Sequence, residues 1–184
     1  MNKQRPLNPK QYEPSGLRLP DMNVESSAME VNGEAATALE ALNTAAETAG
    51  LHFTVASAYR SYNNQVTTYD SVVNGYGQAE ADRQSARPGY SEHQTGWAAD
   101  LGAVGGKCRI EACFADTAEG KWLAANAYKY GFIIRYPQGK ETVTGYQYEP
   151  WHVRYVGKSL STEMHKQKIQ TLEEFFNLPA APDY

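Results

Sequence analysis

The stretch from residue 91 to residue 100 reads SEHQTGWAAD and places His93 seven positions before Asp100. Small residues lie between the two, and the apolar end of the stretch predicts a short strand over 97–101. Both side chains are good zinc ligands, because zinc binds imidazole nitrogen and carboxylate oxygen. A catalytic zinc site needs three protein ligands and one open position, so a third ligand is expected elsewhere in the chain.

A second cluster, Glu149-Pro150-Trp151-His152, offers the missing ligand together with a carboxylate three residues before it. His152 can complete the protein shell of the metal, while Glu149 stays outside that shell. A carboxylate in this position can take a proton from water and return it to a leaving group. The two clusters together predict a catalytic zinc site with Glu149 as general acid/base.

The segments before the first cluster predict a helix, a strand and a second helix. A run rich in Ala and Leu over 31–49 ends at Gly50, which is typical of a helix. The apolar stretch over 51–58 predicts a strand that delivers Tyr59 and Arg60 at its end. A helix over 62–73 with Ser61 as its N-cap follows, and 75–90 is expected to be a polar loop.

The segments after it predict a helix from Asp116 to Tyr130, strands over 132–136 and 151–156, a turn over 137–148 between them, and a last amphipathic helix over 161–176. The prolines within 1–29 predict an irregular arm wrapped over the domain, and 179–184 is expected to be a loose tail. The pattern favours an α+β fold with a mainly antiparallel sheet flanked by helices.

Length and composition predict one domain covering 1–184, because 184 residues with 41% hydrophobic content can bury one sizeable core. The net charge of −4 excludes strong nonspecific attraction to nucleic acid. No stretch is apolar for the roughly 18 residues that a membrane span needs, and the first residues lack the apolar centre of a secretory signal. We therefore expect any signal or anchor of an exported protein to lie outside this sequence.

The two cysteines, Cys108 and Cys113, have four residues between them and no further Cys or His nearby. Such a pair is typical of a small disulfide-closed loop, and two free thiols in a reducing compartment are the alternative. A structural zinc site is disfavoured because it would need about four Cys or His ligands. The disulfide interpretation favours an exported protein.

The two clusters resemble the signature of the zinc D-Ala-D-Ala carboxypeptidases, Ser-x-His-x-x-Gly-x-Ala-x-Asp followed by Glu-x-Trp-His. This family includes the vancomycin-resistance D,D-carboxypeptidases and the Gram-positive L,D-carboxypeptidases, which belong to the LAS-type metallopeptidases with a hedgehog-like fold. The resemblance extends to NKQRPL at 2–7, AYRSYNNQ at 58–65 and YGFIIRY at 130–136, and it is closest to the L,D group.

The resemblance implies that His93, Asp100 and His152 bind one zinc ion per chain and that Glu149 is the general acid/base. It gives Arg60 an electrostatic role, in which its guanidinium stabilises an oxyanion or binds a substrate carboxylate. Ser91 and Gln65 resemble positions that hold polar groups of the peptide. Four aromatic residues are expected to line the cleft, or else to belong to the core: Tyr59, Tyr146, Tyr148 and Trp151.

The expected function is hydrolytic release of a C-terminal D-alanine from peptidoglycan stem peptides, with an L,D preference for tetrapeptides. We expect it on the cell-wall side of the membrane, in a monomer without protein or nucleic acid partners. Three alternatives stay open: a D,D preference for pentapeptides, an endopeptidase, and a non-catalytic peptidoglycan-binding module. His52 and His165 are expected to be structural. The charges of the last helix are expected to form a solvated face: Glu163, Lys166, Lys168, Glu173 and Glu174.

Overall fold

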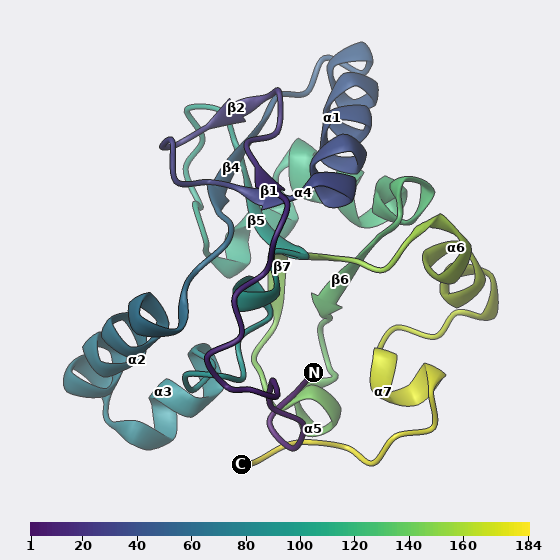
Figure 1. Cartoon of the computed structure of the whole chain (residues 1–184). Coiled ribbons are helices and arrows are strands. Elements are labelled where there is room, and N and C mark those ends of the chain that lie inside the picture. Colours follow the sequence, from purple (N-terminus) through teal and green to yellow (C-terminus); the bar gives the residue numbers. More distant parts are fainter.

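A five-stranded sheet forms the centre of the computed structural model, which describes residues 1–184 (Figure 1). Its strands follow the order β2-β4-β5-β7-β6. The main strands are β4 (Phe53–Ser57), β5 (Ala98–Ala103), β6 (Phe132–Tyr136) and β7 (Glu149–Tyr155). All pairings among these four are antiparallel, whereas the short edge strand β2 (Asn23–Val24) is parallel to β4. The prediction of an α+β fold with a mainly antiparallel sheet is confirmed, and the sheet as a whole is mixed.

The core lies between one face of this sheet and two helices, α1 (Gly33–Thr48) and α4 (Ala118–Asn126). Helix α1 is capped by Asn32, whose side chain accepts from the backbone N–H of Glu34. Its Leu39 and Leu42 are fully buried and belong to the same cluster as the following strand residues: Phe53, Val55, Ala99, Leu101, Trp151 and Val153. Because side chains alternate along a strand, the residues between these ones face the other side of the sheet.

The remaining elements lie around the sheet. Helices α2 (Tyr62–Tyr76) and α3 (Gln78–Gln84) form one group away from α1, and α6 (Lys158–Gln167) and α7 (Leu172–Phe175) form another beyond β6 (Figure 1). The short elements are β1 (Leu17–Arg18), β3 (Val31–Asn32), α5 (Glu141–Thr144) and the 3-10 turns η1 (Glu92–Thr95), η2 (Ala112–Asp116) and η3 (Ala127–Tyr130). The structure contains no helix that is both long and apolar enough to cross a membrane.

The N-terminal arm and the C-terminal tail end near each other, beside α5 (Figure 1). The arm is largely irregular, as predicted, but contributes β1 and the sheet edge β2. The tail was predicted to be loose, and the structure shows instead that Ala181 is fully buried and that the hydroxyls of Tyr184 and Tyr146 lie 3.0 Å apart. Tail residues bury apolar and aromatic surface against α5 and the arm, which the prolines alone do not reveal.

Three other predicted elements are wrong in their extent. The loop expected over 75–90 contains α3, which begins after Gly77 adopts a positive φ of 80° and ends α2. The helix expected over 161–176 is two helices, because Lys168 adopts the left-handed conformation and Thr171 caps a new helix by accepting from the backbone N–H of Glu174. The helix expected from Asp116 begins after Thr117, whose hydroxyl accepts from the backbone N–H of Gly120.

Candidate active site

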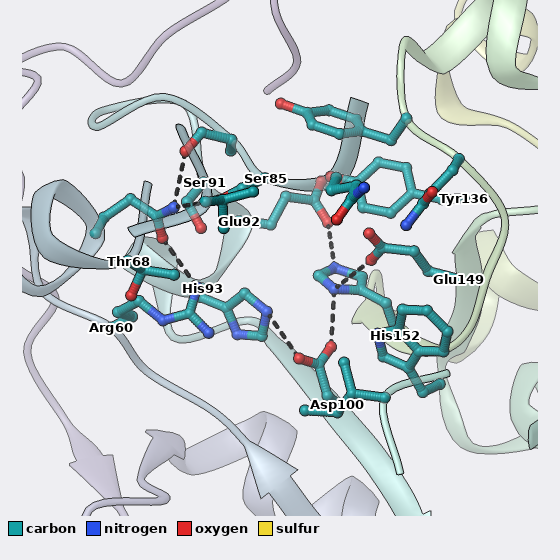
Figure 2. A pocket seen from close by; sticks show the side chains of 18 residues that line it. Arg60, Thr68, Ser85, Ser91, Glu92, His93, Asp100, Tyr136, Glu149 and His152 are labelled. Atoms are coloured by element: carbon teal, nitrogen blue, oxygen red, sulfur yellow. Dashed lines mark hydrogen bonds and ion pairs between the residues drawn. The ribbon is translucent and has the colours of Figure 1, made fainter. Parts of the chain in front are cut away.

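Three potential metal ligands, His93, Asp100 and His152, lie close together in one cleft (Figure 2). Their nearest ligand atoms all lie within 4.8 Å of one another, and all three residues are buried. The Nε2 atom of His93 is 3.3 Å from Oδ2 of Asp100, and Nδ1 of His152 is 3.0 Å from Oδ1 of the same carboxylate. We call these three residues the ligand cluster; the structure brings together the residues that the sequence singled out.

The sheet register and one glycine position this cluster. Asp100 on β5 is the direct cross-strand partner of His152 on β7, so their side chains emerge on the same face. His93 comes from the 3-10 turn η1, which Gly96 ends with a φ of 72°. A Cβ at Gly96 would lie 2.6 Å from Leu17, so the turn into β5 requires glycine both for its conformation and for its close packing.

Hydrogen bonds orient both imidazole rings. Nδ1 of His93 lies 2.7 Å from the carbonyl oxygen of Ala58, which can only accept, so Nδ1 carries the proton and Nε2 presents its lone pair to Asp100. On the other ring, Nε2 of His152 lies 3.4 Å from Oε2 of Glu92. This leaves Nδ1 of His152 directed at Asp100.

The cluster has the chemistry of a zinc site. Asp100 Oδ1 is buried and has no aligned hydrogen-bond partner, although Nδ1 of His152 is close to it. A buried acceptor without a donor is costly, and a cation between the ligands would satisfy it. Two imidazoles and one carboxylate are a common protein shell of catalytic zinc, with a position left for water or substrate. The residues therefore fit this metal.

The three residues of the ligand cluster have pKa values that are shifted in different directions. Burial would raise the pKa of Asp100, but the neighbouring His93 and His152 outweigh it and hold that pKa well below its ordinary value. Burial favours the neutral form of His152, yet the close carboxylates of Asp100 and Glu92 raise its pKa to about 10. Burial lowers the pKa of His93. The metal-free site thus holds a proton on His152 that a bound cation would replace.

Glu149 lies at the start of β7, outside the ligand cluster but next to it. Its Oε2 is 3.6 Å from Nδ1 of His152, and the side chain lines the same cleft (Figure 2). Burial, with the nearby Asp100 carboxylate, raises the pKa of Glu149 to about 8. A divalent cation beside it would lower that pKa again. Because burial raises the pKa of Glu149 and a bound cation lowers it, the carboxyl can exchange a proton near neutral pH.

Arg60 extends from the segment after β4 toward the same cleft. Its Nη2 donates to Ser57 Oγ at 2.8 Å and its Nη1 to Gln65 Oε1 at 3.1 Å. The Gln65 amide in turn donates to the carbonyl of Ala86 at 2.7 Å. Gln65 lines the cleft, and its amide is engaged in fixing Arg60 and the loop at Ala86.

The cleft has a volume of about 250 Å³. Ser91, Tyr146 and Trp151 line it, and Trp151 also belongs to the core cluster. Tyr59 and Tyr148 are not among the residues that line it. Burial and the charge of Glu13, in the N-terminal arm, raise the pKa of the Tyr59 phenol, consistent with a position on the arm side.

The sequence interpretation missed three residues beside the ligand cluster: Glu92, Arg135 and Tyr136. Tyr136 lines the cleft, with its ring centroid 4.9 Å from that of His152. Arg135 is fully buried and binds Glu92 and Glu173. The prediction that Glu173 belongs to a solvated face is therefore wrong. The sequence does contain a signal for these buried charges, which is the arginine inside the apolar strand FIIRY, because a buried charge requires partners.

Cys108 and Cys113 form a disulfide, which closes a loop that carries Ile110 to the edge of the cleft. The other two histidines lie away from the ligand cluster. His52 is exposed, and the His165 ring stacks on Tyr128 with centroids 3.6 Å apart.

Comparison with known proteins identifies relatives over most of the chain. It is 45% identical over 182 residues to the putative carboxypeptidase YodJ of Bacillus subtilis, covering 96% of this chain and 65% of that protein. The chain thus spans just under two thirds of the length of this curated relative.

Two solved structures share the fold at substantial identity. An LdcB LD-carboxypeptidase, described with its peptidoglycan recognition, superposes with a TM-score of 0.87 at 44% identity, covering 96% of this chain and 83% of that one. A vancomycin-resistance D,D-pentapeptidase VanY in complex with Zn(II) superposes with a TM-score of 0.80 at 32% identity, covering 96% of each chain. The sequence model of the D-alanyl-D-alanine carboxypeptidase family VanY matches residues 28–158, and the chain therefore belongs to this family.

Proposed function

We propose that this chain is a zinc carboxypeptidase that releases the C-terminal D-alanine of peptidoglycan stem peptides. The observation that carries the proposal is the convergence on one cleft of the ligand cluster, the Glu149 carboxylate and the Arg60 guanidinium. No structural zinc site needs a cleft with an adjacent carboxylate, whereas peptide hydrolysis uses each of these groups.

His93, Asp100 and His152 would hold the zinc ion, which lowers the pKa of water toward about 7 and polarises a carbonyl oxygen. Glu149 takes the proton from the attacking water and returns it to the leaving amine. Arg60, held by Ser57 and Gln65, directs its positive charge into the cleft, where it stabilises the oxyanion or binds the terminal carboxylate of the substrate. No covalent intermediate with the protein is required.

We favour an L,D preference, for tetrapeptide stems. The similarity to LdcB supports it, and an L,D-carboxypeptidase DacB of Streptococcus pneumoniae is a further structural neighbour with 38% identity. The alternative is a D,D preference for pentapeptides, which the 40% identity to a D-alanyl-D-alanine carboxypeptidase of Enterococcus faecium supports. Because LdcB is described with its peptidoglycan recognition, we propose that the activity lies on the cell-wall side of the membrane. We also propose that the chain acts as a single-domain monomer.

The test is release of free D-alanine from synthetic tetrapeptide and pentapeptide stems, with zinc and with a chelator. Release from the tetrapeptide alone, lost with the chelator and in Glu149→Gln, is the expected result. The matched control is Glu163→Gln on α6, whose carboxylate accepts from Gln167 at 2.7 Å far from the cleft and which should keep full activity.

Other outcomes discriminate between the alternatives. Preference for the pentapeptide would replace the L,D assignment by the D,D one. Cleavage inside the stem without D-alanine release would indicate an endopeptidase. Binding of both stems without cleavage, in protein that carries zinc, would contradict an enzyme and support a peptidoglycan-binding module.

A further inference from the structure

Glu92 is a fully buried carboxylate that the proposed reaction does not use. Its two oxygens have different partners: Oε1 accepts from Nε of Arg135 at 2.9 Å, and Oε2 lies 3.4 Å from Nε2 of His152. A second guanidinium, that of Arg154, lies 3.6 Å from Oε1. A carboxylate that only neutralised Arg135 would have no need to direct one oxygen at the ring of a metal ligand.

The partners of Glu92 determine which nitrogen of the His152 ring donates a hydrogen bond to it. Oε1 of this carboxylate accepts from Arg135 at 2.9 Å and lies 3.6 Å from Nη1 of Arg154, and a carboxylate paired with two guanidinium groups accepts hydrogen bonds. Nε2 of His152 must therefore donate, which leaves Nδ1 as the ligand atom facing Asp100 (Figure 2). Hydrogen bonds of this kind fix the tautomer and the orientation of a metal-binding imidazole.

Glu92 is itself held in place from the far end of the chain. Arg135, on β6, donates from both Nη atoms to Glu173 on α7, at 3.0 and 2.7 Å. Glu173 Oε1 also accepts from the side-chain amide of Asn2 at 2.8 Å. We call Glu92, Arg135 and Glu173 the Arg135 network. Their side chains are at most 2% exposed, so this support is shielded from water.

We propose that Glu92 is a positioning residue of the metal site, which holds His152 with Nδ1 toward the metal. The inference rests on the proposed function, because it assumes that the ligand cluster binds zinc. It concerns zinc affinity, which is measured without substrate and so separately from catalysis.

The experiment compares Glu92→Gln with the matched variant Glu173→Gln. Each removes one charge from a carboxylate bound to Arg135, but only Glu92 contacts a metal ligand. Zinc dissociation constants are measured by competition with a chromogenic chelator, with circular dichroism to verify folding. We expect Glu92→Gln to weaken zinc binding by about 10-fold to 100-fold, and Glu173→Gln to stay within about threefold of wild type, as expected of a residue without a ligand contact.

A second variant and a second measurement cover the case in which Glu92→Gln does not fold. Glu92→Asp keeps the negative charge beside Arg135 but withdraws it from His152 by one methylene, and should also weaken zinc binding. In zinc-loaded protein labelled with 15N, the ring Nε2–H of His152 should give a protected signal that is shifted or lost in either Glu92 variant. A general loss of stability would not change that signal selectively.

Wild-type zinc affinity and an unchanged ring signal in folded Glu92→Gln or Glu92→Asp would overturn the inference alone. An equal loss of affinity in Glu173→Gln would also overturn it, because the effect would then come from the stability of the whole network. Absence of zinc binding by the wild-type chain would overturn the proposed function and this inference together.

Discussion

The ligand cluster and the Arg135 network are two buried charged groups that lie next to each other and differ in how their polar atoms are satisfied. In the network, both Glu173 oxygens accept from Arg135, whose Nε binds Glu92. In the cluster, two histidines surround a carboxylate that keeps an unsatisfied oxygen and faces a cleft. A buried network whose polar atoms all have hydrogen-bond partners stabilises one conformation. A buried polar atom that lacks a partner can gain one when a ligand binds.

This difference predicts that substitutions in the two regions affect separate properties. Changes at the cleft should reduce activity or metal binding while the fold persists. Changes in the network should reduce the free energy of unfolding. Glu92 is the exception, because it contacts both regions.

The largest effect is expected for Glu149→Gln at the cleft. Loss of the general acid/base should reduce kcat for D-alanine release by about 10²-fold to 10⁴-fold. Zinc affinity and the free energy of unfolding should change little, because Glu149 is not in the ligand cluster. Steady-state kinetics, zinc competition and urea unfolding measure the three quantities. Loss of zinc together with activity would show that Glu149 is a ligand and not the acid/base.

The next effect is expected for Arg135→Met in the network. It leaves Glu92 and Glu173 buried without their partner, which should lower the free energy of unfolding by about 3 to 5 kcal/mol. Urea unfolding of metal-free protein measures it. The control is Arg18→Met, which breaks an ion pair with Glu40 whose arginine side chain is 41% exposed and should cost under about 1 kcal/mol. Equal losses in both variants would contradict the structural role of the network.

A smaller effect is expected from pH. The raised pKa of His152, about 10, means that the metal-free ring is protonated at neutral pH, so zinc must displace one proton. The apparent zinc affinity should therefore rise at least about tenfold per pH unit from pH 7 to 9, and fall as the solution is acidified. Calorimetry in two buffers of different ionisation enthalpy measures the released proton. A pH-independent affinity in this range would show that His152 is already neutral before zinc binds.

The sequence by itself determined the ligand cluster, Glu149 and the order of the main elements. Ligand chemistry and spacing limit these choices, and the long apolar or Ala-rich runs have one dominant periodicity. Only the tertiary structure decided which side chains surround the cluster. Tyr59 is not among the residues that line the cleft, Gln65 binds Arg60, and Glu173 lies buried on a separate helix that follows the helix end at Lys168. These outcomes depend on contacts such as that between Arg135 and Glu173, 38 positions apart, and no local pattern of polarity or propensity specifies the partner of a buried charge.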